Sequence, residues 1–149
     1  MGYDPSGNIY YMNPANIRFS QDTISKYFSD RTTTVGTMVT KLKTKQLKVS
    51  EIPAIRIFPA KWIIDYREKF YKVSDENVEK LKQEIKNTEY EIWFSIDNRR
   101  LYAFKEAGLT SVPVFKLTLR QASNSFQQDK LTTFRDDTLG VGKKINIRN

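Results

Sequence analysis

Two adjacent arginines, Arg99 and Arg100, are the side chains whose type and spacing best suit binding chemistry in this sequence. They follow Asp97 and Asn98 in a short polar turn between a predicted strand and a predicted helix. Guanidinium groups bind phosphate oxygens through paired hydrogen bonds, and the start of a helix presents unpaired N–H groups with a partial positive charge. The spacing therefore predicts an anion-binding site at this turn.

The same turn also fits a purely structural role. Asp97 or Asn98 would then cap the helix, and the two arginines would pair with nearby carboxylates. Residue type and spacing do not decide between the two interpretations, so both stay open at this point.

Basic residues outnumber acidic ones, with 25 lysines and arginines against 17 aspartates and glutamates and a net charge of +8. Such a charge favours a negatively charged partner, most often nucleic acid, which basic side chains attract without reading its sequence. The alternatives are a solvated helix end whose cations suit the helix dipole, and a C-terminal segment that completes a sheet edge. The basic residues in question are Lys41, Lys43, Lys45, Lys143, Lys144 and Arg148.

The sequence contains no cysteine and no histidine. This excludes a disulfide framework, a zinc site of Cys and His ligands, a thiolate nucleophile and a histidine general base. An enzyme built from the remaining residues would use Asp97 and Glu91 as metal ligands, with Arg18, Arg99 and Arg100 gripping phosphate. A further acidic pair, residues 136 and 137, lies in a polar stretch typical of a solvated loop. No cofactor is expected.

Hydrophobic periodicity predicts the elements that must hold the arginine turn in place. Alternating residues from Tyr90 to Ile96 predict a strand that leads into Asp97, and Gly108 predicts the end of the following helix. The other expected elements are a short helix from Ser20 through Phe28, a helix capped by Thr33 or Thr34, a strand at Ile52–Phe58, a hairpin arm or helix at Lys61–Val73, a helix from Ser74 to about Lys86, and a strand at Val112–Leu119.

Aromatic residues are concentrated in the segment after Lys61. Exposed rings there would dock a protein partner, since aromatic side chains dominate interface cores. The alternative, which we favour, is that these rings fill the core of this domain. The residues are Trp62, Tyr66, Phe70 and Tyr71.

The stretch from Phe94 to Leu117 resembles the arginine box of ParB/sulfiredoxin-like domains. In both, a strand runs into a turn with two arginines, and then come a helix, Ala107-Gly108-Leu109 and Val112-Pro113-Val114. The segments Asn13–Arg18 and Ile52–Ile57 resemble the opening turn and first central strand of that family, in the same order.

The resemblance covers residues 13–119 and implies an α+β fold, a small mixed sheet flanked by helices. It implies an arm over residues 1–12, a helical insertion near residues 61–89, and a polar, basic extension over residues 120–149. Three departures limit what carries over. The chain has no cysteine for sulfiredoxin activity, no second nucleotide-binding box after Leu119, and Asp97 where the family has glycine.

Together these observations predict a non-catalytic basic module that contacts DNA, weakly and with little sequence preference, as an accessory subunit of a larger DNA-modifying assembly, for example an adenine DNA methyltransferase complex. Arg18, Asn98, Arg99 and Arg100 would hold a phosphate or an acidic partner loop. The alternatives are a ParB-like nucleotide-binding or nuclease-type enzyme and a pure protein–protein scaffold.

No stretch of about 18 apolar residues is present, and Met1–Met12 has no basic start followed by an apolar block. The sequence therefore predicts an intracellular protein, nuclear or cytoplasmic, without a membrane partner.

Overall fold

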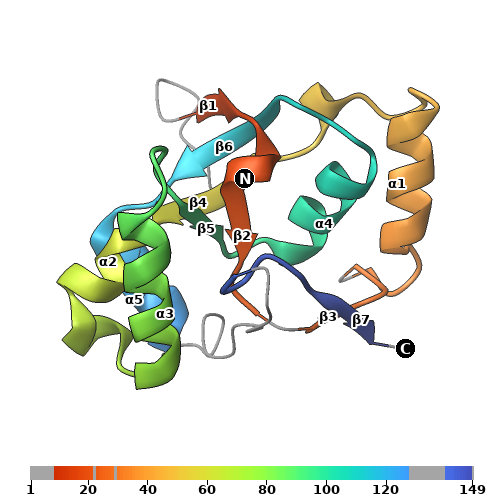
Figure 1. Cartoon of the computed structure of the whole chain (residues 1–149). Helices are drawn as coiled ribbons and strands as arrows, with labels where there is room; N and C mark the ends of the chain where they lie inside the picture. The colour runs from red at the N-terminus through yellow and green to blue at the C-terminus, as the bar shows by residue number, and fades with distance from the viewer. Residues whose placement is uncertain (1–8, 22, 29, 128–139, 149) are drawn as a thin grey trace.

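The structure is a computed structural model that describes residues 9–21, 23–28, 30–127 and 140–148. Its centre is a five-stranded mixed sheet with strand order β1-β6-β4-β5-β2. Helices α1 and α4 cover one face of the sheet, and helices α2, α3 and α5 cover the other (Figure 1). This confirms the expected α+β class with a mixed sheet flanked by helices.

The elements follow one another closely along the chain. In order they are β1 (Ile9–Met12), the 3₁₀ turn η1 (Pro14–Asn16), β2 (Ile17–Phe19), β3 (Thr23–Ser25), α1 (Val35–Lys43), the 3₁₀ turn η2 (Val49–Glu51), β4 (Ile55–Pro59), α2 (Lys61–Asp65), the 3₁₀ turn η3 (Arg67–Phe70), α3 (Asp75–Lys86), β5 (Trp93–Ser95), α4 (Asn98–Glu106), β6 (Val112–Lys116), α5 (Leu119–Gln127) and β7 (Asn146–Arg148).

Side chains alternate between the two faces along the central strand β4, and because helices cover both faces, the strand is buried on each side. Ile55 and Ile57 pack with α1 and α4, whereas Phe58 packs on the opposite side. The ring of Phe58 stacks with Phe70 at 5.6 Å and with Trp62 at 6.5 Å between ring centroids. Two of the four proposed partner-binding aromatics are thus largely core residues. Phe70 is fully buried and Trp62 is half-buried.

The other two proposed partner-binding residues lie at the surface. Tyr66 is 38% exposed and Tyr71 is 61% exposed. The segment that carries all four is helical, in α2 and η3, so of the two forms expected for Lys61–Val73 the helix is found.

Helix ends follow the expected capping residues. The Thr34 hydroxyl accepts a hydrogen bond from the Thr37 N–H at the start of α1, and Ser74 does the same for the N–H of Asn77 at the start of α3. Gly108, with φ of 74°, ends the helix that follows the arginine turn. None of the helices in the described ranges is long and apolar enough to cross a membrane.

Three segments differ from the sequence-based expectation. Ser20–Phe28 contains strand β3 instead of a helix, because β3 pairs in parallel with β7, more than 100 residues later. Ile9–Met12 is not part of an arm, because it pairs with β6 as the edge strand β1. The C-terminal extension contains a helix, α5, where only a polar stretch was expected, whereas β7 agrees with the expected completion of a sheet edge. The acidic pair at 136 and 137 lies outside the described residues.

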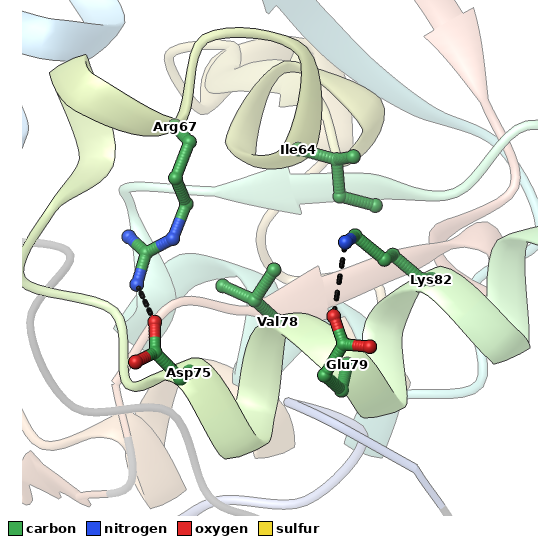
Figure 2. A pocket seen from close by; sticks show the side chains of 6 residues that line it. All are labelled: Ile64, Arg67, Asp75, Val78, Glu79 and Lys82. Atoms are coloured by element: carbon green, nitrogen blue, oxygen red, sulfur yellow. Dashed lines mark hydrogen bonds and ion pairs between the residues drawn. The ribbon is translucent and has the colours of Figure 1, made fainter.

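The helical segment between β4 and β5 encloses a shallow hollow of about 380 Å³ (Figure 2). Its charged side chains have partners within the segment. Arg67 donates to Asp75 at 2.9 Å and to the Val73 carbonyl at 2.6 Å, and Lys82 pairs with Glu79 at 2.9 Å. The hollow is lined by Ile64, Arg67, Asp75, Val78, Glu79 and Lys82.

The C-terminal segment closes the outer edge of β2. The Phe19 N–H donates to the Gly142 carbonyl at 2.8 Å, and the neighbouring Val141 is 1% exposed. Gly142 has φ of 76°, and a Cβ built there would overlap the Phe19 carbonyl oxygen and lie 2.8 Å from the Phe94 ring. Glycine is therefore required at this contact for both backbone conformation and space.

We expect Gly142→Ala to lower the free energy of unfolding by about 2–4 kcal/mol, because it combines a left-handed backbone with overpacking. Gly108→Ala is the matched control: Gly108 has nearly the same φ, but no atom lies within 4 Å of the added Cβ. It should cost only about 1 kcal/mol. Urea unfolding of both variants compares them, and equal losses would contradict the close contact at Gly142.

Candidate nucleic-acid interface

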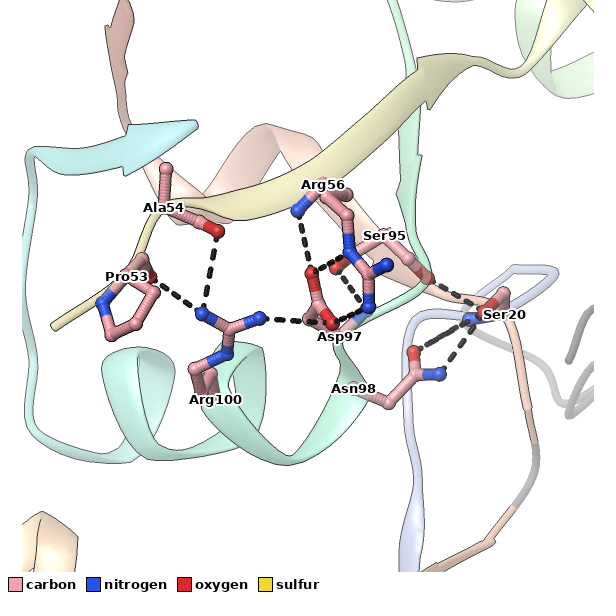
Figure 3. A network of polar contacts seen from close by, with 8 residues as sticks. All are labelled: Ser20, Pro53, Ala54, Arg56, Ser95, Asp97, Asn98 and Arg100. Atoms are coloured by element: carbon pink, nitrogen blue, oxygen red, sulfur yellow. Dashed lines mark hydrogen bonds and ion pairs between the residues drawn. The ribbon is translucent and has the colours of Figure 1, made fainter. Parts of the chain in front are cut away.

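The arginine turn is built around the carboxylate of Asp97, whose side chain is 9% exposed (Figure 3). One carboxylate oxygen, Oδ2, accepts from the backbone N–H of Arg56 at 2.7 Å and from its Nε at 3.0 Å. The other, Oδ1, accepts from the Arg56 guanidinium at 2.6 Å and from the Arg100 guanidinium at 2.9 Å. One carboxylate thus connects β4, the end of β5 and the first turn of α4.

Burial alone would raise the pKa of Asp97 because it disfavours the charged carboxylate. The hydrogen bonds and positive charges of Arg56 and Arg100 together outweigh this effect, and the pKa of Asp97 lies below its ordinary value of 3.8. The carboxylate is therefore ionised at neutral pH and balances two guanidinium groups.

The two adjacent arginines do not converge on one anion. Successive residues of a helix point about 100° apart, so Arg99 and Arg100 leave α4 in different directions. Arg100 donates to the Pro53 carbonyl at 2.7 Å as well as to Asp97 (Figure 3). Arg99 donates to the Tyr27 carbonyl at 2.7 Å, with its guanidinium 5.7 Å from the centre of the Phe28 ring. The prediction that the two guanidinium groups form one anion-binding site is therefore wrong. Arg99 fastens α4 to the loop at Tyr27, and Arg100 fastens it to the loop at Pro53.

Asn98 is also an internal residue, 5% exposed. Its side-chain oxygen accepts from the Ser20 N–H at 2.9 Å, and its side-chain nitrogen donates to the Ser20 hydroxyl at 3.0 Å. Neither Asn98 nor Asp97 caps α4 through its side chain. The Asn98 side chain joins α4 to the chain after β2 and does not face a ligand.

Arg18, expected to hold phosphate, is 5% exposed. It forms an ion pair with Glu84 on α3 and donates to the Val141 carbonyl at 3.1 Å. Glu84 in turn accepts from the Val141 N–H at 3.1 Å. This corrects the assignment of Arg18, because the pair clamps the C-terminal segment against β2 and leaves the guanidinium facing inward.

In this arrangement Asp97 is not available as the metal ligand that the enzyme alternative requires. Both carboxylate oxygens of Asp97 accept hydrogen bonds from arginines, and Glu91 lies exposed before β5. Over the described ranges, no three acidic side chains gather in a way that would hold a metal ion.

The lysines after the middle of α1 face solvent. This α1 lysine surface comprises Lys41, Lys43, Lys45 and Lys48, all exposed. No acidic residue occurs in the sequence between Asp30 and Glu51. Lys45 has φ of 63° and ends the helix in the left-handed conformation, where glycine is usual. The charge of this surface is therefore not balanced by acids of the same segment.

The second basic region is the C-terminal basic segment, residues 143–148, which carries Lys143, Lys144 and Arg148. Lys143 and Lys144 are exposed just before β7, and Arg148 donates to the Thr23 hydroxyl at 2.7 Å. Within this segment β7 completes a two-stranded sheet with β3, which was one of the two roles expected for it. It lies below the sheet in Figure 1, near the start of α1, whereas the α1 lysine surface lies at the other end of that helix.

Lys105 on α4, which the sequence did not single out, lies near Lys143 of the C-terminal basic segment. Its ammonium lies 5.4 Å from the centre of the Phe19 ring. Burial and, to a smaller extent, the positive charges of Arg18 and Lys143 together lower the pKa of Lys105 to about 8. Only the tertiary fold brings these three cations together from β2, α4 and the C-terminal segment, so no local sequence signal would have identified Lys105.

Comparison with protein-family models, with curated proteins and with solved structures finds no match to this chain. What the chain does is therefore inferred from its own residues and geometry.

We expect Asp97→Asn to lower the free energy of unfolding by about 2–3 kcal/mol, because it leaves two arginines without their buried partner. Asp75→Asn is the matched control, because the Asp75 side chain is 98% exposed although it also pairs with an arginine. That change should cost less than about 0.5 kcal/mol. Urea unfolding at pH 7 measures both, and a small loss in Asp97→Asn would contradict the central role of this carboxylate.

The lowered pKa of Lys105 predicts a pH dependence of stability. Between about pH 8 and 10.5 the unfolded chain holds a proton on this lysine that the folded chain has lost, so its contribution to stability rises with pH over that range. Thermal unfolding of the wild type and of Lys105→Met at pH 7 and pH 10 isolates the contribution of Lys105 to this pH dependence. The wild type should gain stability relative to the variant at pH 10, and parallel curves would contradict the lowered pKa.

Proposed function

We propose that this chain is a non-catalytic basic module of the ParB/sulfiredoxin-like type that contacts DNA as an accessory subunit of a larger DNA-modifying assembly. An adenine DNA methyltransferase complex is an example of such an assembly. The single observation that carries the proposal is the α1 lysine surface, where four exposed lysines stand in a segment without acidic residues.

A surface of this kind suits phosphate contacts made without base readout. Lysines that neutralise backbone phosphates release condensed counterions, and this attraction is independent of nucleotide sequence. The internal arginines do not add to it, since Arg18 and Arg100 are occupied by Glu84 and Asp97. Weak binding with a steep salt dependence is what the remaining exposed lysines would supply.

The order of the motif segments along the chain supports the family part of the proposal. The Asn-Pro turn at η1, the central strand β4, the β5–α4 turn and the Val-Pro-Val of β6 occur in the sequence expected from the resemblance. The aspartate that replaces glycine in the turn binds arginines of the chain itself, which favours a structural corner over a nucleotide-binding one.

The triple variant Lys41→Gln, Lys43→Gln and Lys45→Gln tests the proposal. Each lost phosphate contact should reduce the slope of log affinity against log salt by about 0.9, so the slope should fall by about 2–3 for duplex DNA. Fluorescence anisotropy with a labelled duplex at several salt concentrations measures this slope.

A matched control changes the same number of lysines elsewhere. Lys80→Gln, Lys82→Gln and Lys86→Gln removes three positive charges from α3, which lies on the other side of the sheet from α1 (Figure 1). Lys80 and Lys82 pair with Glu76 and Glu79. This control should leave the slope nearly unchanged. An equal effect of both triple variants would mean that net charge alone governs binding, and no binding by the wild type would refute the proposal.

A further inference from the structure

One end of the sheet face that α1 and α4 cover carries a row of two aromatic rings and one cation, Tyr10, Lys116 and Trp93. Tyr10 lies opposite Val114 in the β1–β6 ladder, and Lys116 follows Val114 by two residues, so their side chains share a face. Lys116 also lies opposite Ile57 of β4, and Trp93 lies opposite Pro59. The row therefore crosses from β1 to β5 where β4 and β6 end.

The cation stands close to both rings. The ammonium of Lys116 lies 4.4 Å from the centre of the Tyr10 ring and 5.0 Å from the centre of the Trp93 ring. Both distances are within the range of a cation–π interaction. Lys116 is exposed, Tyr10 is 45% exposed and Trp93 is half-buried. In the described part of the chain no acidic side chain forms an ion pair with Lys116.

Such a row offers the two things that a nucleotide needs. A solvent-exposed aromatic ring such as that of Tyr10 is a platform for a nucleobase, since every base has a π-face. Lys116 is exposed and can attract the neighbouring phosphate, and the chain as a whole carries a charge of +8. The high positive charge thus favours a ligand with many negative charges over a ring compound that is neutral or carries a single acidic group.

We propose that the Tyr10–Lys116–Trp93 row binds an unpaired base of single-stranded nucleic acid by stacking, with Lys116 contacting an adjacent phosphate. This inference rests on the proposed function and adds to it a preference for single strands over duplexes. A base inside a duplex is already stacked on its neighbours and cannot lie against these rings. The α1 lysine surface accepts either form of nucleic acid, so the row is what distinguishes single strands from duplexes.

Tryptophan fluorescence of the full chain titrated with a dT oligonucleotide tests the proposal. The emission should be quenched on binding, and the quenching should disappear in Trp93→Phe, in which Trp62 is the remaining tryptophan. Tyr10→Ala should weaken binding of the oligonucleotide about tenfold. Tyr10→Phe keeps the ring and should bind as the wild type does, which separates stacking from the phenol hydroxyl.

Tyr66→Ala is the matched control, since Tyr66 is a comparably exposed tyrosine outside the row. It should leave the affinity unchanged, and the melting temperature of each variant shows that it is folded. If the duplex binds but the oligonucleotide binds no better and Tyr10→Ala has no effect, the proposed function stands and the role of the row is overturned. If neither binds, both proposals are overturned.

Discussion

The ion pairs of Asp97 with Arg56 and Arg100 are the interactions on which the rest of this structure depends. Asp97 ends β5 and starts α4, and its carboxylate binds the backbone N–H of Arg56 in the central strand. The antiparallel pairing of β4 and β5 continues to this point, because the Ile96 N–H donates to the Arg56 carbonyl. The Asp97 carboxylate, together with the hydrogen bonds of Asn98 and Arg99, therefore holds α4 in its direction from the sheet, and α4 provides much of the core beneath α1.

A second internal ion pair, between Arg18 and Glu84, holds the C-terminal segment against the sheet, as Asp97 holds α4. Arg18 and Glu84 each bind a backbone group of Val141, and Gly142 lies against the chain at Phe19. This contact covers the edge of β2, where unpaired backbone groups would otherwise be open to another chain. The C-terminal extension is therefore part of the domain, and it brings Lys143 to the side of Lys105.

These pairs divide the cations of the protein into two groups. Arginines near the sheet are held by acidic side chains and backbone carbonyls inside the fold, where removing one partner strongly lowers the stability of the protein. Lysines on α1 and before β7 remain at the surface, where they are free to attract phosphate. The residues that look most like a ligand site in the sequence are thus structural, and the less distinctive lysines form the candidate interface.

Local signals in the sequence were sufficient for several parts of this structure. The caps at Thr34 and Ser74 and the glycine end at Gly108 follow from side chains and backbone conformations that act within a few residues. The strand leading to Asp97 and the helix after it follow from the period of buried residues. Such signals need no knowledge of distant partners.

Contacts between distant parts of the chain decided the rest. The alternation of residues could not show that Thr23–Ser25 pairs with a strand at the C-terminus, or that Ile9–Met12 pairs with β6. A two-arginine turn has the same sequence whether its guanidiniums face water or a carboxylate; Arg56, 41 residues before Asp97, decided that here. The sequence determined which side chains carry charge, and only the tertiary structure determined which of those charges are neutralised inside, because that depends on the distance between residues far apart in the chain.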